Sequence, residues 1–243
     1  MGILFANENV TRALRMNDSF KEHSIITVPE LYNVDKKITD HTDLGVFINK
    51  TIICEPTIYS RLRDCLMELN GENWTDKNLI CGKSHLAPEY PNNIAYNALM
   101  MRNHFFHLLN ATDNEILESI KAIQINVKQG YTRCSCLPVG DMAAITEDVS
   151  LANHLSNNGY KVLKIEPGHV DLPGYPYGFI GGSGGTVESS VVLNGSLSFH
   201  PDKNRIETFI EAQGYNIVEL HGGRLVDCGS ILYFTDKNEG ASC

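Results

Sequence analysis

One cysteine near the end of the sequence occupies a position where a thiol could act as a nucleophile. Cys228 lies in the stretch GGRLVDCGSIL, between a glycine-rich turn and a run of aliphatic residues. A thiol nucleophile needs a partner that moves protons, and His221 lies in the loop that leads into this stretch. These two residues are the candidates for thiol chemistry in this part of the sequence. The alternative is a buried structural cysteine, which is common for free thiols.

Five short stretches could position further polar side chains around such a nucleophile. Each has a polar second residue and continues with small or aliphatic residues, which is typical of a strand that runs from a site into a core. The stretches are TDLGVFI (42–48), NNIAYNA (92–98), GDMAAIT (140–146), GSGGTVE (182–188) and VDCGSIL (226–232). Their second residues are Asp43, Asn93, Asp141, Ser183 and Asp227. We expect these side chains to meet at a common centre.

Helical segments alternate with these strands, and four of them end at an Asn-Gly or Gln-Gly pair. They are residues 55–71, 111–130, 146–159 and 200–214. Glycine just after a helix adopts a positive φ at little cost, so the four endings predict four similar caps. A unit repeated in this way closes by stacking on its neighbours. The prediction is an α+β fold, a five-bladed pseudo-symmetric α/β-propeller, although a doubly wound sheet also alternates helices and strands.

The predicted organisation is a single domain over residues 1–243. Residues 1–40 are expected to form an N-terminal extension, residues 41–235 the propeller and residues 236–243 a tail.

With these features the sequence resembles the pentein (guanidine-modifying, α/β-propeller) superfamily, which includes dimethylarginine dimethylaminohydrolases, arginine deiminases and amidinotransferases. GGRLVDCGSIL is similar to the strand that carries the nucleophile, PNNIAYNAL (91–99) to the first strand, and VGDMAAIT (139–146) to a Gly-Asp strand. The resemblance implies a cysteine-dependent hydrolase or transferase acting on guanidine-like or amidine-like small molecules. By this match Cys228 is at the position of the nucleophile, and His221 or an unassigned base would move protons. The residues expected to bind that molecule in the axial pocket are Asp43, Asn93, Asn97, Asp141, Ser183, Glu188 and Asp227.

The sequence departs from the family pattern at two places that matter for catalysis. The segment expected to carry the family's histidine, GFIGGSGGTVESSVVLNG (178–195), contains none and has glycine there, near Gly184. Asn97 and Ala98 stand where the family has acidic residues. An alternative prediction is therefore an inactive propeller that binds a small molecule or another protein.

The composition and charge of the chain indicate which partners and cofactors are not expected. The net charge is −9 and there is no run of basic residues, so nucleic acid and anionic membranes are not expected partners. The seven cysteines are scattered, without the paired spacing of a zinc site, and no metal or other cofactor is expected. The start of the sequence lacks the pattern of a signal peptide, which predicts a cytoplasmic protein with reduced thiols.

One aromatic segment is a further candidate for the wall of a ligand site. LPGYPYGFI (172–180) places Tyr175 and Tyr177 in a loop before the fourth of the five stretches. Aromatic residues on loops commonly line pockets, so these tyrosines could rim a ligand site. The segment could equally be a rigid connector.

Overall fold

The structure is a computed structural model that describes residues 2–235. These residues form an α+β fold whose strands make five sheets of three strands each. The sheets are β15 (Leu232–Phe234), β1 (Ile3–Ala6) and β2 (Ser24–Thr27); β3 (Val46–Ile48), β4 (Ile52–Cys54) and β5 (Leu79–Cys81); β6 (Leu99–Met101), β7 (His104–His107) and β8 (Ile123–Asn126); β9 (Cys136–Val139), β10 (Ala143–Thr146) and β11 (Lys161–Lys164); and β12 (Gly184–Val187), β13 (Ser190–Leu193) and β14 (Asn216–Glu219).

Every sheet is built in the same way. Its first two strands are antiparallel, and its second and third strands are parallel. A parallel pair needs a crossover connection, which a helix usually supplies. The crossover helices are α1 (Glu8–Met16), α3 (Pro56–Asn70) with α4 (Glu72–Asn78), α5 (Asn114–Ser119), α6 (Val149–Asn157) and α7 (Lys203–Ala212).

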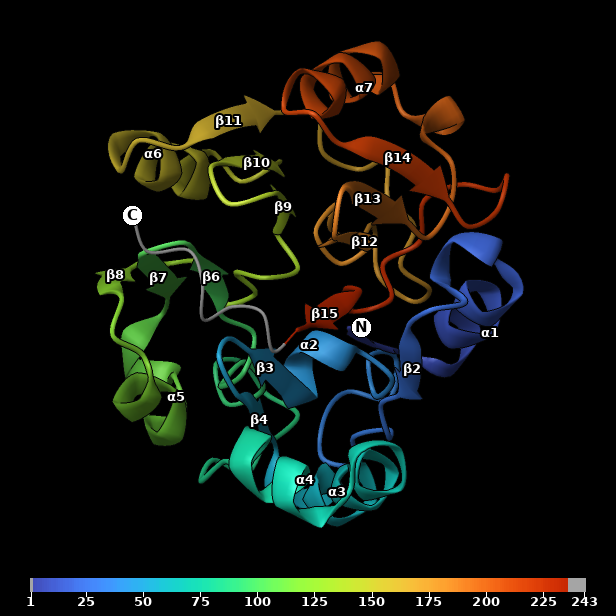
Figure 1. The fold of residues 1–243 in the computed structure, drawn as a ribbon. Helices are drawn as coiled ribbons and strands as arrows, with labels where there is room; N and C mark the ends of the chain where they lie inside the picture. Colours follow the sequence, from blue (N-terminus) through green and yellow to red (C-terminus); the bar gives the residue numbers. More distant parts are fainter. Residues whose placement is uncertain (1, 236–243) are drawn as a thin grey trace.

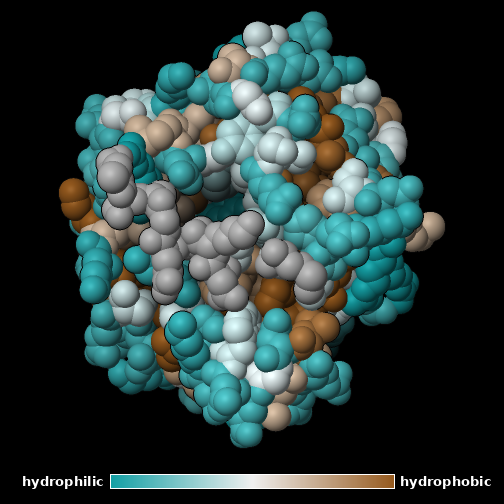
Figure 2. Space-filling model, viewed as in Figure 1, coloured by the Kyte–Doolittle hydropathy of each residue, from teal (hydrophilic) through white to brown (hydrophobic). Residues whose placement is uncertain are grey.

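The five sheets surround a common centre (Figure 1). Strands β15, β3, β6, β9 and β12 lie nearest that centre, and the crossover helices lie on the outside of the ring (Figure 1). The short helix α2 (Thr42–Gly45) leads directly into β3. In the same view the surface is hollowed at the centre of the ring (Figure 2). The ends of the inner strands therefore come together from segments far apart in the sequence.

Three of the four predicted helix caps are present. Gly71, Gly159 and Gly214 follow helices α3, α6 and α7 with φ between 80° and 86°. The prediction of one helix over residues 111–130 is wrong, because α5 ends at Ser119 and β8 follows. Ile123 begins this strand, whose parallel partner is β7, and its side chain is exposed rather than buried.

The N-terminal residues are part of the ring rather than an extension on one side of it. Strand β1 lies between β15 and β2, with Leu4 opposite Tyr233 and Ile25. Leu4 is fully buried in a core cluster with Val10 and Leu14 of α1. Within residues 2–235, no helix is long and apolar enough to cross a membrane. The predicted tail, residues 236–243, lies outside the described residues.

Candidate functional site

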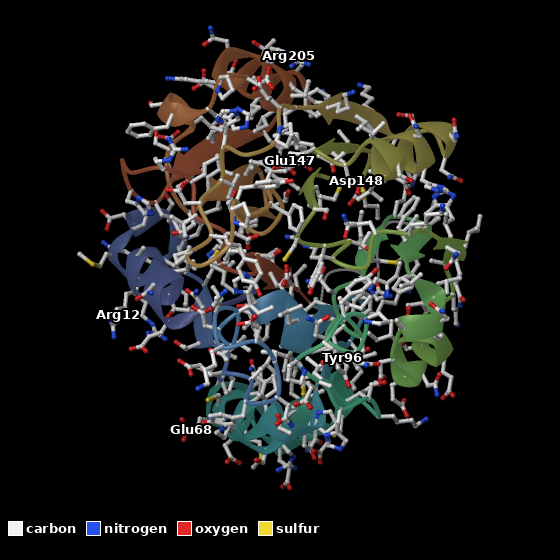
Figure 3. The ribbon with its side chains drawn as sticks, turned by 180° about the vertical axis from the view of Figure 1, so that it is seen from behind. Arg12, Glu68, Tyr96, Glu147, Asp148 and Arg205 are labelled. Atoms are coloured by element: carbon white, nitrogen blue, oxygen red, sulfur yellow. The ribbon has the colours of Figure 1, made fainter. Side chains whose placement is uncertain are left out.

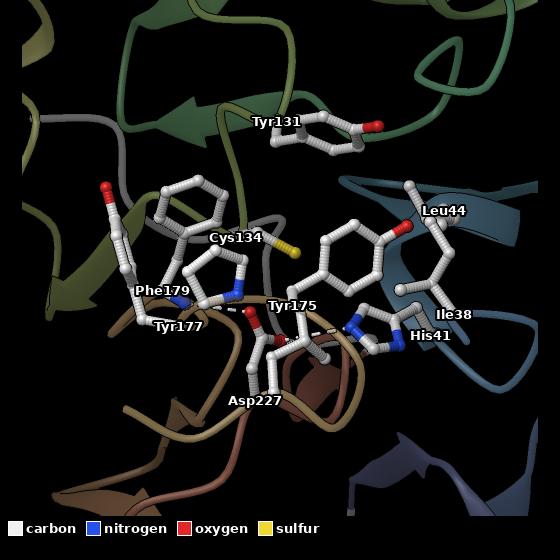
Figure 4. A pocket seen from close by; sticks show the side chains of 11 residues that line it. Ile38, His41, Leu44, Tyr131, Cys134, Tyr175, Tyr177, Phe179 and Asp227 are labelled. Atoms are coloured by element: carbon white, nitrogen blue, oxygen red, sulfur yellow. Dashed lines mark hydrogen bonds and ion pairs between the residues drawn. The ribbon is translucent and has the colours of Figure 1, made fainter. Parts of the chain in front are cut away.

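A cavity of about 300 Å³ opens beside the ends of the inner strands. Most of its wall is aromatic or aliphatic, and its strongly polar side chains are His41, Cys134 and Asp227 (Figure 4). The lining residues are Ile38, His41, Leu44, Tyr131, Cys134, Leu172, Tyr175, Pro176, Tyr177, Phe179 and Asp227. A concave, largely apolar site with a few converging polar groups is typical of small-molecule binding.

Backbone N–H groups hold the Asp227 carboxylate in the cavity, and two neighbouring glycines leave room for it. Its Oδ2 accepts a hydrogen bond from the Phe179 amide at 2.9 Å, and its Oδ1 accepts one from the Gly229 amide at 3.1 Å. A Cβ atom at Gly182 would lie 1.9 Å from Asp227 Oδ1, and one at Gly178 would lie 2.4 Å from its Cβ. The glycine-rich segment therefore permits the close approach that places this carboxylate.

His41 lies between two carboxylates. Its Nε2 is 3.3 Å from Asp227 Oδ1, and its Nδ1 is 3.4 Å from Asp40 Oδ1. Burial alone would lower the pKa of His41, but the contacts with Asp227 and Asp40 outweigh burial and raise it to about 10. His41 is therefore an imidazolium at neutral pH, with one cation facing two carboxylates.

Cys134 presents a thiol to the cavity, backed by Asp43 and Asn97. Its Sγ donates to Asp43 Oδ2 at 2.9 Å, and the Asn97 side-chain amide approaches the same sulfur at 3.5 Å. Asn97 Oδ1 accepts from the amides of Arg133 and Cys134, which fixes the backbone that carries the thiol. Burial, together with Asp43 and Asp227, raises the pKa of Cys134 well above the usual range for a thiol. Cys134 is therefore protonated and acts as a hydrogen-bond donor.

Two of the tyrosines that line the cavity have their hydroxyl groups bonded elsewhere. The Tyr131 hydroxyl accepts from Asn93 Nδ2 at 2.7 Å, and the Tyr175 hydroxyl donates to Asp35 Oδ2 at 3.0 Å. As proposed from the aromatic segment, Tyr175 and Tyr177 both line the cavity (Figure 4). The aromatic rings therefore supply most of the surface that a ligand would meet.

The structure does not place Cys228 and His221 at this cavity. Cys228 is buried in the core cluster around Leu4 and Val10, and its Sγ donates to the Gly182 carbonyl at 3.2 Å. Burial, with Asp227 and Asp43, raises the pKa of Cys228 well above its usual range. His221 is exposed in the loop after β14, where its Nδ1 accepts from the Gly223 amide. Nothing in the structure joins the two residues.

Asp141 and Glu188 lie outside the central cluster. Asp141 is exposed in the turn between β9 and β10, and Glu188 is exposed in the turn between β12 and β13. The prediction that Asp141 begins a central strand is wrong, because the inner strand of that sheet is β9 and the stretch 140–146 supplies its hairpin partner β10.

The other predicted binding residues are buried near the centre. Asp43, Asn97 and Asp227 surround Cys134, and Asn93 holds Tyr131. Ser183 is buried, and its hydroxyl donates to the Ile180 carbonyl instead of facing the cavity. Three residues that line the cavity were not predicted from the sequence, namely His41, Tyr131 and Cys134. The stretch TRCSCLPV also runs from polar to apolar residues, with Arg133 as its second residue, so this pattern could have drawn attention to the segment that carries Cys134.

A buried arginine lies next to this site along the chain. Arg133 donates from Nη1 to the carbonyls of Cys136 and Gly181, and from Nη2 to those of Gly184 and Ile231, at 3.0–3.4 Å. Its side chain lines a second, smaller cavity of about 60 Å³ at the inner strands. Arg133 therefore ties together segments from three sheets, while the neighbouring Cys134 faces the larger cavity.

Glu147 is a further buried titratable group close to Asp227, and it supports a prediction about pH dependence (Figure 3). Burial raises the pKa of Glu147 to about 8, although its Oε1 accepts from the Ile180 amide. The folded protein holds this proton up to about pH 8, whereas the unfolded chain releases it near pH 4.5. Stability is therefore lost as the pH rises from about 4.5 to about 8.

Glu147→Gln is expected to remove this loss. The variant should melt a few degrees higher than the wild type near pH 8 and no higher near pH 4.5, since about 1 kcal/mol shifts Tm by roughly 2–4 °C in a domain of this size. Thermal unfolding followed by circular dichroism across this pH range measures the difference. Glu68→Gln, at an exposed position on the outside of the ring, is the matched control (Figure 3). Equal shifts in both variants would refute the assignment.

Among residues 2–235 no group of three or more His, Cys, Asp or Glu side chains is arranged to hold a metal ion. The chemistry of the site rests on a carboxylate, an imidazolium, a thiol and aromatic rings.

One known protein family matches nearly the whole length of the chain. One family model, described as "Family of unknown function (DUF6873)", matches residues 6–232. The chain belongs to this family. No curated protein matches the sequence of this DUF6873 member.

Several solved structures resemble the DUF6873 chain in fold. A cysteine-to-serine variant of agmatine deiminase from C. jejuni with substrate bound has a TM-score of 0.52 at 9% identity, covering 95% of this chain and 92% of that one. Agmatine deiminase from the same organism has a TM-score of 0.50 at 9% identity, covering 90% and 87%. DDAH from Pseudomonas aeruginosa in complex with citrulline has a TM-score of 0.46 at 11% identity, covering 90% of each chain. The two agmatine deiminase structures, with TM-scores of 0.50 and 0.52, show that this chain shares their fold.

Proposed function

We propose that this protein is a five-bladed α/β-propeller that binds a small cationic molecule in its central cavity. The proposal rests on the charged groups at the cavity. There the imidazolium of His41 faces the carboxylates of Asp40 and Asp227. The imidazolium of His41 and the carboxylates of Asp40 and Asp227 together carry one excess negative charge, which favours a ligand of one positive charge.

A cation also suits the wall of the cavity. Tyr131, Tyr175, Tyr177 and Phe179 line it, and the faces of aromatic rings attract cations. An anion would be repelled by the carboxylates and would find no free cationic donor among the described lining residues, since His41 is already paired.

The test is calorimetric titration with tetramethylammonium chloride and methylguanidinium chloride, with sodium acetate as the anion. At least one cation is expected to bind with a Kd near the millimolar range, and Asp227→Asn should weaken it about tenfold, a loss of about 1.4 kcal/mol. Asp141→Asn removes an exposed carboxylate in the β9–β10 turn and should leave binding unchanged. Binding of neither cation, or equal losses in the two variants, would overturn the proposal.

A second candidate function is catalysis by the Cys134 thiol on an amidine-like cation. It is favoured by the 2.9 Å contact between Cys134 Sγ and Asp43 Oδ2, because Asp43 could accept the thiol proton when an electrophilic carbon approaches. The raised pKa of Cys134 opposes it, since the nucleophile is the thiolate. The structural resemblance to guanidine-modifying enzymes keeps a hydrolase or transferase among the candidates.

A further inference from the structure

We propose that the cation bound by this cavity has no hydrogen-bond donors and is a quaternary ammonium group. This inference rests on the proposed function and names the class of ligand. It follows from three features of the described residues: the aromatic wall of the cavity, the backbone donors that already engage the lining carboxylate, and the negative charge beside His41.

The carboxylate that lines the cavity is already bonded through both of its oxygens. Asp227 Oδ1 receives the Gly229 amide and faces His41 Nε2, while Oδ2 receives the Phe179 amide. Asp43, the next carboxylate, is not part of the lining, and its Oδ2 accepts from Cys134 and Ser230. A guanidinium presents several N–H donors in a plane and binds best where matching acceptors are free, because a buried donor left unpaired is destabilising.

Two of the three tyrosine hydroxyls at the cavity are engaged with residues that do not line it. The Tyr131 hydroxyl is bonded to Asn93 and the Tyr175 hydroxyl to Asp35, and Lys37 Nζ lies 4.9 Å from the centroid of the Tyr175 ring. Phe179 has no hydroxyl, and its ring meets that of Tyr177 edge-on with 6.5 Å between centroids. Much of the ligand-facing surface is therefore ring carbon.

A quaternary ammonium matches this combination of charge and surface. Its charge is spread over methyl or methylene groups that contact rings favourably and need no acceptors. The excess negative charge around Asp227, 96% of whose surface is buried, attracts it at short range without a hydrogen bond. A neutral molecule of the same shape would gain the apolar contacts but not the electrostatic attraction.

The experiment compares three probes of similar size under constant ionic strength: choline chloride, its uncharged analogue 3,3-dimethylbutan-1-ol, and methylguanidinium chloride. Isothermal titration is expected to show choline binding at least about tenfold more tightly than either of the others, a difference of about 1.4 kcal/mol. Tyr177→Leu should remove most of this preference, because Tyr177 is half-exposed and its ring lines the cavity. Tyr32→Leu, at a tyrosine outside the cavity, is the matched control.

The possible failures are distinguishable. If methylguanidinium binds as tightly as choline or more tightly, the inference is wrong while the proposed cation site stands. If choline and its neutral analogue bind equally, the charge plays no part and the inference also fails. If no cation binds, the proposed function fails with it. Circular dichroism melting of Tyr177→Leu ensures that a loss of binding is not a loss of fold.

Discussion

Replacement of Arg133 by methionine is expected to lower the free energy of unfolding by about 5 kcal/mol, which is a large part of the total for most domains. The guanidinium is buried and donates to four backbone carbonyls, those of Cys136, Gly181, Gly184 and Ile231. Methionine fills much of the same volume but supplies no donor. Each carbonyl would then lose a charge-assisted hydrogen bond in a place that water does not reach easily.

A graded series keeps this prediction open to refutation even if Arg133→Met does not fold. Arg133→Lys retains the charge but cannot reach four acceptors at once, so we expect about half of the loss. Arg12→Met removes an exposed arginine at the outside of the ring and should change stability by less than about 0.5 kcal/mol (Figure 3). Urea unfolding followed by circular dichroism measures all three variants. A lysine variant as stable as the wild type would refute the role assigned to the guanidinium.

Iodoacetamide is expected to modify Cys65 and Cys81 first, Cys134 more slowly and Cys228 slowest of these four. Cys65 and Cys81 are exposed, whereas Cys134 reaches only the cavity and Cys228 lies in a core cluster. Burial and neighbouring carboxylates raise the pKa of both inner thiols, so each should react about a hundredfold or more below the rate of an unhindered thiol near neutral pH. Mass spectrometry of the separate peptides measures each rate.

The same measurement decides between binding and catalysis. A catalytic Cys134 would be labelled much faster by 2-chloroacetamidine than by 2-chloroacetamide, because a bound amidinium lowers the thiol pKa and presents its carbon to the sulfur. We expect no such acceleration, since Asp43 and Asp227 both favour the protonated thiol. Cys65 in the same sample is the internal control. Acceleration of more than about tenfold at Cys134, absent from Cys65, would make catalysis the better proposal. Rapid labelling of Cys228 would instead restore the sequence-based nucleophile.

The sequence contained enough information to predict the repeated unit. The glycine caps at Gly71, Gly159 and Gly214 are local signals, because a positive φ favours glycine in any fold. Asp43 and Asp227 were found because a polar residue before an apolar strand marks the end of a core segment. These signals act over a few residues and do not depend on the rest of the chain.

The incorrect prediction for Asp141 arose because the two strands of a hairpin have similar sequence patterns. In the fourth sheet both β9 and β10 follow polar residues, so the pattern around Asp141 is as good as that around Cys134. Only the packing of neighbouring sheets decides which strand faces the centre. One of the two ion pairs of His41 likewise involves Asp227, which is distant in the sequence, and no local pattern predicts a contact of that kind.

Because β1 lies between β2 and β15, its sheet can form completely only after β15 has been translated. Ile3 and Phe5 are made long before their antiparallel partners Phe234 and Leu232. Chains generally fold from the N-terminus as they leave the ribosome, but here one edge of β1 has no partner until β15 emerges. The nascent chain must carry this open edge until residues 232–234 have been made.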